Sequence, residues 1–382
     1  MKNNRKIIYW AVFLSSVPFA LTHYINSSFI TATVGEKFVG LLYTLGSISS
    51  LAVLSFVPII FRRIGAYKFL IWVAALDVIY FFILAKTRGM LWISTVFVLG
   101  FSLNILVSFA LDEFLKIFSK NSWLGRVRGI VLIVTHVAFI LTQLSVWLYW
   151  GSKSFASVYL ASSLLTAFFL LVSIFIFRNA PEPEYDKVTH VRFIKEFFKK
   201  KNLLRAYGIN LLLQIFYSWM IIYTTIYLSI HLGFSWNQIG IMFAIMLIPF
   251  LVLPFHLGKY GDTFGERKML MVGFLVAGFA TLAIFFKANG GIIIWTILLL
   301  FSRVGASIIE VMSDAYFFKH IKPENEQYIG VYRSTAPLSY ILGPLLASFI
   351  FLFVPFNFIY LVLCALMLYG VYLSSTIRKG DI

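Results

Sequence analysis

Long apolar runs alternate with short polar segments along the whole chain. Each run has at least 20 residues, which is about the length a helix needs to cross the hydrocarbon core of a bilayer. Such a helix satisfies its backbone hydrogen bonds internally and can turn apolar side chains toward lipid. Twelve spans are predicted, at residues 7–33, 38–61, 67–86, 90–115, 127–150, 155–178, 204–231, 236–257, 268–287, 291–318, 329–353 and 356–377. The pattern predicts an all-α integral membrane protein with twelve transmembrane helices.

The composition excludes a soluble globular protein. Apolar residues make up 60% of the 382 residues, charged residues only 12%, and the mean hydropathy is +0.90. A soluble domain carries roughly a quarter charged residues. The single cysteine, Cys364, excludes an intrachain disulfide and a thiolate metal site. We expect neither a metal nor a cofactor.

The net charge of +17 could indicate a nucleic-acid ligand, but its distribution indicates membrane topology. With a cytoplasmic N-terminus, 25 of the 32 lysines and arginines fall on the cytoplasmic side and 5 on the other. The remaining two, Arg303 and Arg333, lie inside predicted spans. This bias follows the positive-inside rule. It predicts a multi-pass protein of the cell membrane with both termini in the cytoplasm and no nucleic-acid partner.

The chain divides into two similar halves around a polar linker. We expect six spans in residues 1–178, a cytoplasmic linker over 179–203, and six spans in 204–382. A short amphipathic helix or a plain charged segment would both fit the linker. Three pairs of landmarks recur 200 to 202 residues apart: Gly65 and Gly265, Asp112 and Asp314, and Gly129 and Gly330. A pseudo-repeat of this kind is common in secondary transporters.

The loop after the eighth span carries a family motif. The stretch from Gly258 to Lys268 (GKYGDTFGERK) resembles the cytoplasmic signature loop of the major facilitator superfamily (MFS) in its second-half copy. The resemblance implies the MFS fold of two six-helix pseudo-repeats. It also implies a cytoplasmic gate built from Gly258, Gly261, Asp262, Gly265, Arg267 and Asp314. The first-half copy has Arg62 where the family has an acidic residue. The glycine-proline signature of drug–proton antiporters is missing from the fifth span, so drug export is unsupported.

Polar residues inside the spans are the candidates for a substrate cavity, since they are costly in lipid and indicate protein-lined or wet surfaces. In the resembled fold, the first, fourth, seventh and tenth spans line a central cavity. We therefore predict a substrate cavity at His23, Asn26, Asn104, Ser108, Asn210, Gln214, Tyr217 and Arg303. For each residue taken alone, an interhelical hydrogen bond is the alternative.

The tenth span carries the strongest constellation. Arg303, Ser307, Glu310 and Asp314 are spaced by four, three and four residues, which places them on one helical stripe. An unpaired charge in hydrocarbon costs at least about 2.5 kcal/mol, so the stripe must face protein or water. Glu310 is the first candidate for a protonatable coupling residue, followed by Asp77 and His23.

These features predict a secondary active transporter of a small polar or amphipathic solute, coupled to protons, and not an enzyme. The loops hold no histidine or carboxylate cluster for a transferase and no nucleotide-binding loop. The expected partners are a small-molecule substrate, protons and the lipid bilayer, with the chain acting as a monomer. A transport-inactive sensor or a lipid scramblase on the same fold is the alternative, because a fold does not determine function.

Overall fold

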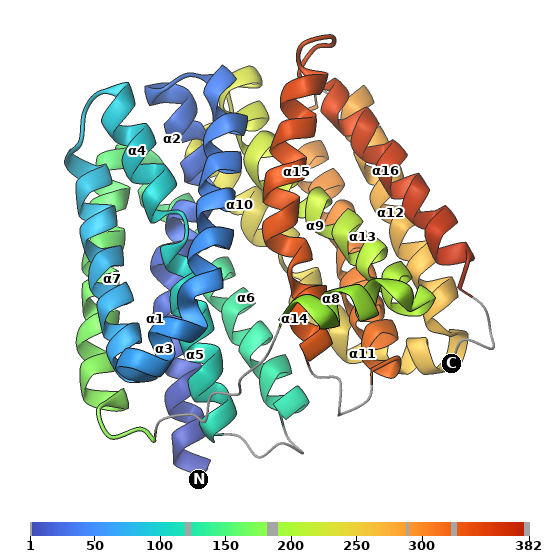
Figure 1. Ribbon diagram of the computed structural model, residues 1–382. Coiled ribbons are helices and arrows are strands. Elements are labelled where there is room, and N and C mark those ends of the chain that lie inside the picture. Colours follow the sequence, from blue (N-terminus) through green and yellow to red (C-terminus); the bar gives the residue numbers. More distant parts are fainter. Residues whose placement is uncertain (1, 119–123, 182–189, 288–289, 322–326, 378–382) are drawn as a thin grey trace. The chain divides into compact units, whose positions relative to one another are not determined.

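The computed structural model describes residues 2–118, 124–181, 190–287, 290–321 and 327–377 (Figure 1). Within these ranges the chain forms helices and no strand. It divides into two compact units, one comprising residues 1–186 and 234–241 and the other comprising residues 187–233 and 242–382.

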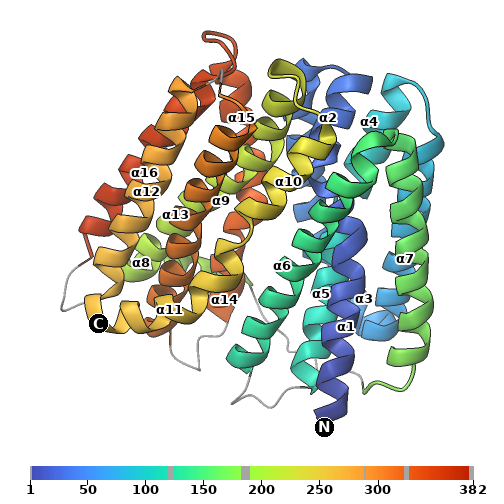
Figure 2. The same cartoon turned by 180° about the vertical axis from the view of Figure 1, so that it is seen from behind.

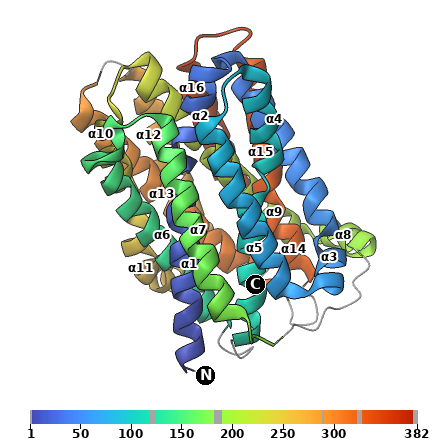
Figure 3. The same ribbon diagram turned by 90° about the vertical axis from the view of Figure 1, so that its left-hand side faces the viewer.

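The first unit is a bundle of helices from the first half of the chain. Its helices are α1 (Lys2–His23), α2 (Ile25–Thr33), α3 (Glu36–Lys86), α4 (Met90–Gly100), α5 (Leu103–Phe118), α6 (Leu124–Leu148) and α7 (Phe155–Phe177), with a short 3-10 turn at Trp150–Ser152. In Figure 3, α3 and α7 run side by side, and they pack against each other directly. The hydroxyl of Tyr67 on α3 donates to the carbonyl of Ile174 on α7, and Ser163 on α7 donates to the carbonyl of Val78 on α3.

The second unit is built around α9. Its helices are α8 (His190–Lys199), α9 (Lys201–Ile226), α11 (Pro249–Phe264), α12 (Glu266–Phe286), α13 (Ile292–Lys319), α14 (Gln327–Arg333), α15 (Thr335–Ile350) and α16 (Phe358–Ser375). A π-helical turn at Tyr227–His231 extends α9, and α10 (Trp236–Met246) leads into α11. Trp219 on α9 donates its indole N–H to the carbonyl of Gly343 on α15 over 2.7 Å. Because that donor is completely buried, this bond fixes the contact between the two helices.

Eleven helical segments among the described residues are long and apolar enough to cross a membrane. The remaining predicted span, 329–353, is divided between α14 and α15, and the 16 residues of α15 are too few to reach that length alone. Large apolar side chains such as Phe255, Phe279 and Phe286 are exposed on the second unit, as expected for surfaces that face lipid. The chain is a multi-pass membrane protein.

The two halves share an unusual backbone conformation. Gly65 interrupts α3 at φ 80° and ψ 160°, and Gly265 separates α11 from α12 at φ 81° and ψ 148°. Positive φ of this kind is accessible to glycine at little cost and rare for other residues. Residues 200 positions apart therefore make the same turn between consecutive spans, which supports the predicted pseudo-repeat.

Small residues allow two helices of the second unit to approach closely. α12 and α13 lie side by side in Figure 2. A Cβ atom added to Gly305 on α13 would lie 2.5 Å from the backbone nitrogen of Ala277 and 2.6 Å from the carbonyl oxygen of Gly273, both on α12. Such backbone contact through small residues is a common way for membrane helices to associate.

The linker contains the amphipathic helix that the sequence allowed. α8 runs crosswise to α9 in Figure 1. Phe197 is completely buried, and its ring contacts those of Tyr207 and Tyr328, whereas Ile194 and Phe198 are exposed. The ring of Phe198 also contacts that of Tyr207, so aromatic contacts hold α8 to the rest of the second unit.

Candidate functional site

The predicted stripe of polar residues lies on α13 in the second unit. Arg303 is 2% exposed and Ser307 is completely buried, while Glu310 and Asp314 are half-buried. The spacing of three and four residues places all four on one side of a regular helix. The surroundings become less enclosed toward the C-terminal end of α13.

Glu310 is held by a tyrosine from the seventh predicted span. The hydroxyl of Tyr217 on α9 donates to Oε2 of Glu310 over 2.9 Å. A hydrogen bond to an ionised carboxylate contributes about 1.5–3 kcal/mol, which is more than a neutral bond does. The bond also links α9 to α13, so a change in the charge of Glu310 acts directly on the contact between these two helices.

Arg303 contacts two aromatic rings of α9. Its guanidinium carbon lies 5.6 Å from the ring centre of Phe216 and 5.5 Å from that of Tyr217, both on α9. Cation–π contacts of this kind contribute about 2 kcal/mol when the pair is desolvated. Among the described residues, the Nε and Nη2 atoms of Arg303 are buried without any hydrogen-bond partner, and so is the hydroxyl of Ser307.

Asp314 bonds to a tyrosine that sequence reasoning missed. The hydroxyl of Tyr332 on α14 donates to Oδ1 of Asp314 over 2.9 Å, and its ring stacks on Phe317 with the centroids 4.0 Å apart. Tyr332 immediately precedes Arg333 in sequence, but nothing in its local pattern marks it as a partner of α13. The contact joins α14 to the end of α13.

Two further residues predicted for the cavity lie on α9. The amide of Asn210 donates to the hydroxyl of Thr335 on α15 over 2.8 Å, and both residues are buried. Gln214 is half-buried one turn further along. The hydrogen bond of Asn210 joins two helices, which is the alternative to a cavity role given above. For Asn210 and Gln214 alike, a role in a substrate cavity stays a prediction.

In the first unit, His23 and Asn26 lie where α1 meets α2. His23 packs against the ring of Phe19, with ring centroids 4.6 Å apart. Asn26 accepts a hydrogen bond from the hydroxyl of Tyr159 on α7 at 2.7 Å. Asn26 therefore joins two helices within its own unit.

The other predicted residues of the first unit are dispersed. Asn104 and Ser108 lie on α5, where Asn104 is half-buried and Ser108 is exposed. Asp77 is 6% exposed on α3 and is one turn from the buried Tyr80. Among the described residues of the first unit, no side chain is seen to hold Asp77 as the Tyr217 hydroxyl holds Glu310 in the second unit.

The signature loop forms the end of α11 and the start of α12. Gly265 makes the turn, and a Cβ on Gly261 would lie 3.1 Å from the side chain of Met312 on α13. Gly258 and Arg267 are exposed. The side chain of Asp262 lies outside the part of the chain that the structure describes, so its predicted part in a cytoplasmic gate stays a prediction.

An ion pair that the sequence did not predict fastens this loop to α13. Lys319 at the end of α13 donates to Oε1 of Glu266 at the start of α12. The Glu266 side chain is 8% exposed and that of Lys319 is 44% exposed. The acidic partner in the loop is therefore Glu266, and it brings together the two ends of the closely packed α12 and α13.

Loss of the lysine should harm the fold more than loss of the glutamate. Lys319→Met leaves the enclosed Glu266 carboxylate unpaired, whereas Glu266→Gln leaves an exposed ammonium that water solvates. After allowance for the exposure of Lys319, we expect Lys319→Met to cost about 1 kcal/mol and Glu266→Gln less. Thermal unfolding of the purified protein in detergent measures both. An equal loss in the two variants would contradict the unequal burial of the pair.

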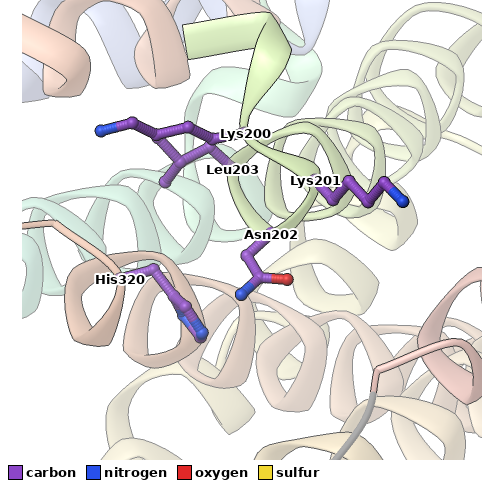
Figure 4. Close-up of a pocket in the computed structure, with 5 residues that line it drawn as sticks. All are labelled: Lys200, Lys201, Asn202, Leu203 and His320. Carbon is purple, nitrogen blue, oxygen red and sulfur yellow. The ribbon is translucent and has the colours of Figure 1, made fainter. Parts of the chain in front are cut away.

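A pocket of about 350 Å³ lies at the start of α9 (Figure 4). It is lined by Lys200, Lys201, Asn202, Leu203 and His320. Figure 4 shows the two lysine side chains extending to opposite sides of the helix start, with Asn202 and His320 directed to one side of it. Sequence reasoning named none of these residues for a site, because charged residues beside a span were read only as a topology signal.

Comparison with known proteins agrees with this architecture. The model of the family described as Major Facilitator Superfamily matches residues 209–379. No curated protein sequence matches the chain.

Solved structures match over nearly the whole length. A point mutant of the nucleoside transporter NupG has a TM-score of 0.78 at 12% identity, covering 98% of this chain and 100% of its own. A second NupG structure has a TM-score of 0.76 at 14% identity, covering 97% of both chains. A bacterial homologue of the human lysosomal transporter Spinster, in an inward-facing and unoccupied conformation, has a TM-score of 0.70 at 12% identity, covering 98% of this chain and 93% of its own. At these identities the likeness establishes the shared fold.

Proposed function

We propose that the chain is a transporter of the Major Facilitator Superfamily, whose family model matches residues 209–379. In this proposal it moves a small polar or amphipathic solute across the cell membrane by alternating access, driven by protons. The family and the structural neighbours are transporters, not enzymes. Both termini lie in the cytoplasm in this proposal, as the positive-inside bias indicates, and the monomer is the working unit.

The observation that supports proton coupling is the hydrogen bond between Tyr217 and Glu310. An ionised carboxylate in an enclosed site needs hydrogen-bond donors or a cation beside it, because burying an unpaired charge is costly. Protonation of Glu310 removes its negative charge, and with it the attraction to the hydroxyl of Tyr217 and to the cation on Arg303. If the two sides of the transport cycle offer Glu310 different partners, protonation shifts the equilibrium between them.

We assign the other residues predicted from the sequence to the cavity surface, to proton coupling and to the cytoplasmic gate. Asn210, Gln214, Tyr217 and Arg303 form the cavity surface of the second unit. His23, Asn26, Asn104 and Ser108 form that of the first unit. Asp77 and His23 are the next coupling candidates after Glu310, and the loop of Gly258, Gly261, Asp262, Gly265 and Arg267 acts as the gate with Asp314.

Uptake into proteoliposomes tests the function. The purified full chain is reconstituted, and a panel of radiolabelled solutes is offered with and without an imposed pH gradient. Nucleosides are the first solutes to offer, because one structural neighbour is a nucleoside transporter. We expect one solute to accumulate only with the gradient and to be released by a protonophore.

Other outcomes separate the alternatives. Equilibration that the gradient does not change would retain transport and exclude proton coupling. Lipid movement between leaflets without solute uptake would support a scramblase, and neither activity would support a sensor on the same fold.

A further inference from the structure

The Arg303 side chain presents two buried donors without acceptors. Both Nε and Nη2 are closed off from solvent and have no hydrogen-bond partner in the described part of the chain. An unpaired buried polar group is destabilising, and the penalty is larger for a charged one. A group of this kind needs an explanation, and a ligand or a second conformation that supplies the missing acceptor is one.

The geometry of the guanidinium limits what that acceptor is. The rings of Phe216 and Tyr217 lie within cation–π distance of the group. Nε and Nη2 lie on the same edge of the plane, so their N–H bonds point in nearly parallel directions. Two parallel donors of this kind match the two oxygens of a carboxylate, which is the basis of bidentate arginine–carboxylate pairs.

A third buried donor without a partner among the described residues lies on the same face of α13. Ser307 is one helical turn further along α13, on the same side of the helix. Its hydroxyl is also buried without a partner. Within one turn of α13, the described structure therefore has three buried donors without an acceptor, two on the guanidinium of Arg303 and one on the hydroxyl of Ser307.

The nearby carboxylate of Glu310 already accepts one hydrogen bond. Glu310 is seven residues from Arg303, which corresponds to about 10 Å of rise along α13. Its Oε2 atom accepts the hydroxyl of Tyr217. The negative charge of Glu310 repels a doubly charged anion such as phosphate on the same stripe more strongly than a singly charged one.

We propose that the transported solute carries a carboxylate, which binds the Nε and Nη2 edge of Arg303 and the hydroxyl of Ser307. This inference rests on the proposed transport function and narrows its substrate class. Because both nitrogens are enclosed in this conformation, the solute enters when another conformation of the cycle opens the site. The solute's remaining parts contact the aromatic rings of α9.

The test compares carboxylates with their neutral amides. Purified full-length protein in detergent is titrated with four matched pairs: acetate and acetamide, lactate and lactamide, benzoate and benzamide, and nicotinate and nicotinamide. Uridine serves as a neutral nucleoside and inorganic phosphate as a second anion. A ligand that binds only the folded state raises the melting temperature, and the rise grows with the logarithm of one plus the ratio of ligand concentration to Kd. We expect at least one carboxylate to stabilise the protein and its amide to fail.

Two substitutions locate the binding. Arg303→Lys keeps the positive charge but removes the paired donors, so the affinity for that carboxylate should fall about tenfold or more. Ser307→Ala leaves the guanidinium intact and should weaken binding about tenfold, the loss of one hydrogen bond to an ionised carboxylate. Arg178→Lys is the matched control, since Arg178 caps α7 in the first unit and is exposed. Each variant's melting temperature without solute shows whether it folds.

Three results of the binding experiments would overturn the inference. They are the absence of stabilisation by every carboxylate, equal stabilisation by an acid and its amide, and unchanged carboxylate affinity in a folded Arg303→Lys variant. Gradient-driven uptake of uridine that survives Arg303→Lys would overturn the carboxylate assignment and leave proton-coupled transport standing. Carboxylate binding without uptake of any solute would support the carboxylate site at Arg303 and contradict the proposed transport function.

Discussion

Glu310→Gln will abolish gradient-driven accumulation while the protein still binds and exchanges its solute. Glutamine keeps the size of the side chain and an oxygen that accepts from Tyr217, but it carries neither a charge nor a transferable proton. With one proton per solute, a gradient of one pH unit supports accumulation of about tenfold, since about 1.4 kcal/mol corresponds to a factor of ten. We expect the accumulation ratio of the variant to fall to about one.

The measurement uses proteoliposomes with an imposed pH gradient, followed by exchange of labelled for unlabelled solute without a gradient. Glu36→Gln makes the same chemical change in the first turn of α3 and serves as the control. If Glu310→Gln concentrates the solute as well as the parent does, the coupling site lies elsewhere, and Asp77→Asn is the next variant to measure.

Gly305→Ala will destabilise the protein by about 1–3 kcal/mol, the usual cost of an extra carbon in a closely packed site. The new Cβ would lie 2.5 Å from the backbone nitrogen of Ala277, and a backbone atom cannot move aside as a flexible side chain can. α12 and α13 would have to separate along their length. This cost exceeds the gain of up to about 1 kcal/mol that alanine brings to a helix interior.

Thermal unfolding in detergent and abundance in the membrane both report this effect. Gly129→Ala on α6 is the matched control, because a Cβ there meets nothing within 4 Å. We expect the control to match the parent or to exceed it slightly. A melting temperature of Gly305→Ala equal to that of the control would show that the two helices are packed less closely than described.

The architecture was predictable because a membrane span is a local property of the chain. A bilayer requires each crossing to be apolar and helical over its own 20 or so residues, so no knowledge of neighbouring helices is needed. The repeat was readable for a similar reason. Gly65 and Gly265 mark turns that require positive φ, and glycine records that requirement in the sequence itself.

The stripe on α13 was also a local inference, since Arg303, Ser307, Glu310 and Asp314 follow from helical spacing alone. What the stripe contacts was not. Tyr217 meets Glu310 from 93 residues away, and Lys319 meets Glu266 from 53 residues away. These pairs depend on how far each helix is rotated and where the helices cross, which is decided by the packing of whole surfaces.

For the site, too, local helical spacing was predictable and the contacts between helices were not. The sequence by itself determined that a charged stripe exists inside a membrane helix and must face protein or water. Only the tertiary structure decided that the glutamate has a tyrosine partner, that the arginine lies near aromatic rings, and that its Nε and Nη2 donors have no acceptor in the described chain. Hydrogen-bond satisfaction is a property of three-dimensional neighbours, and a sequence pattern contains only the residues that need them.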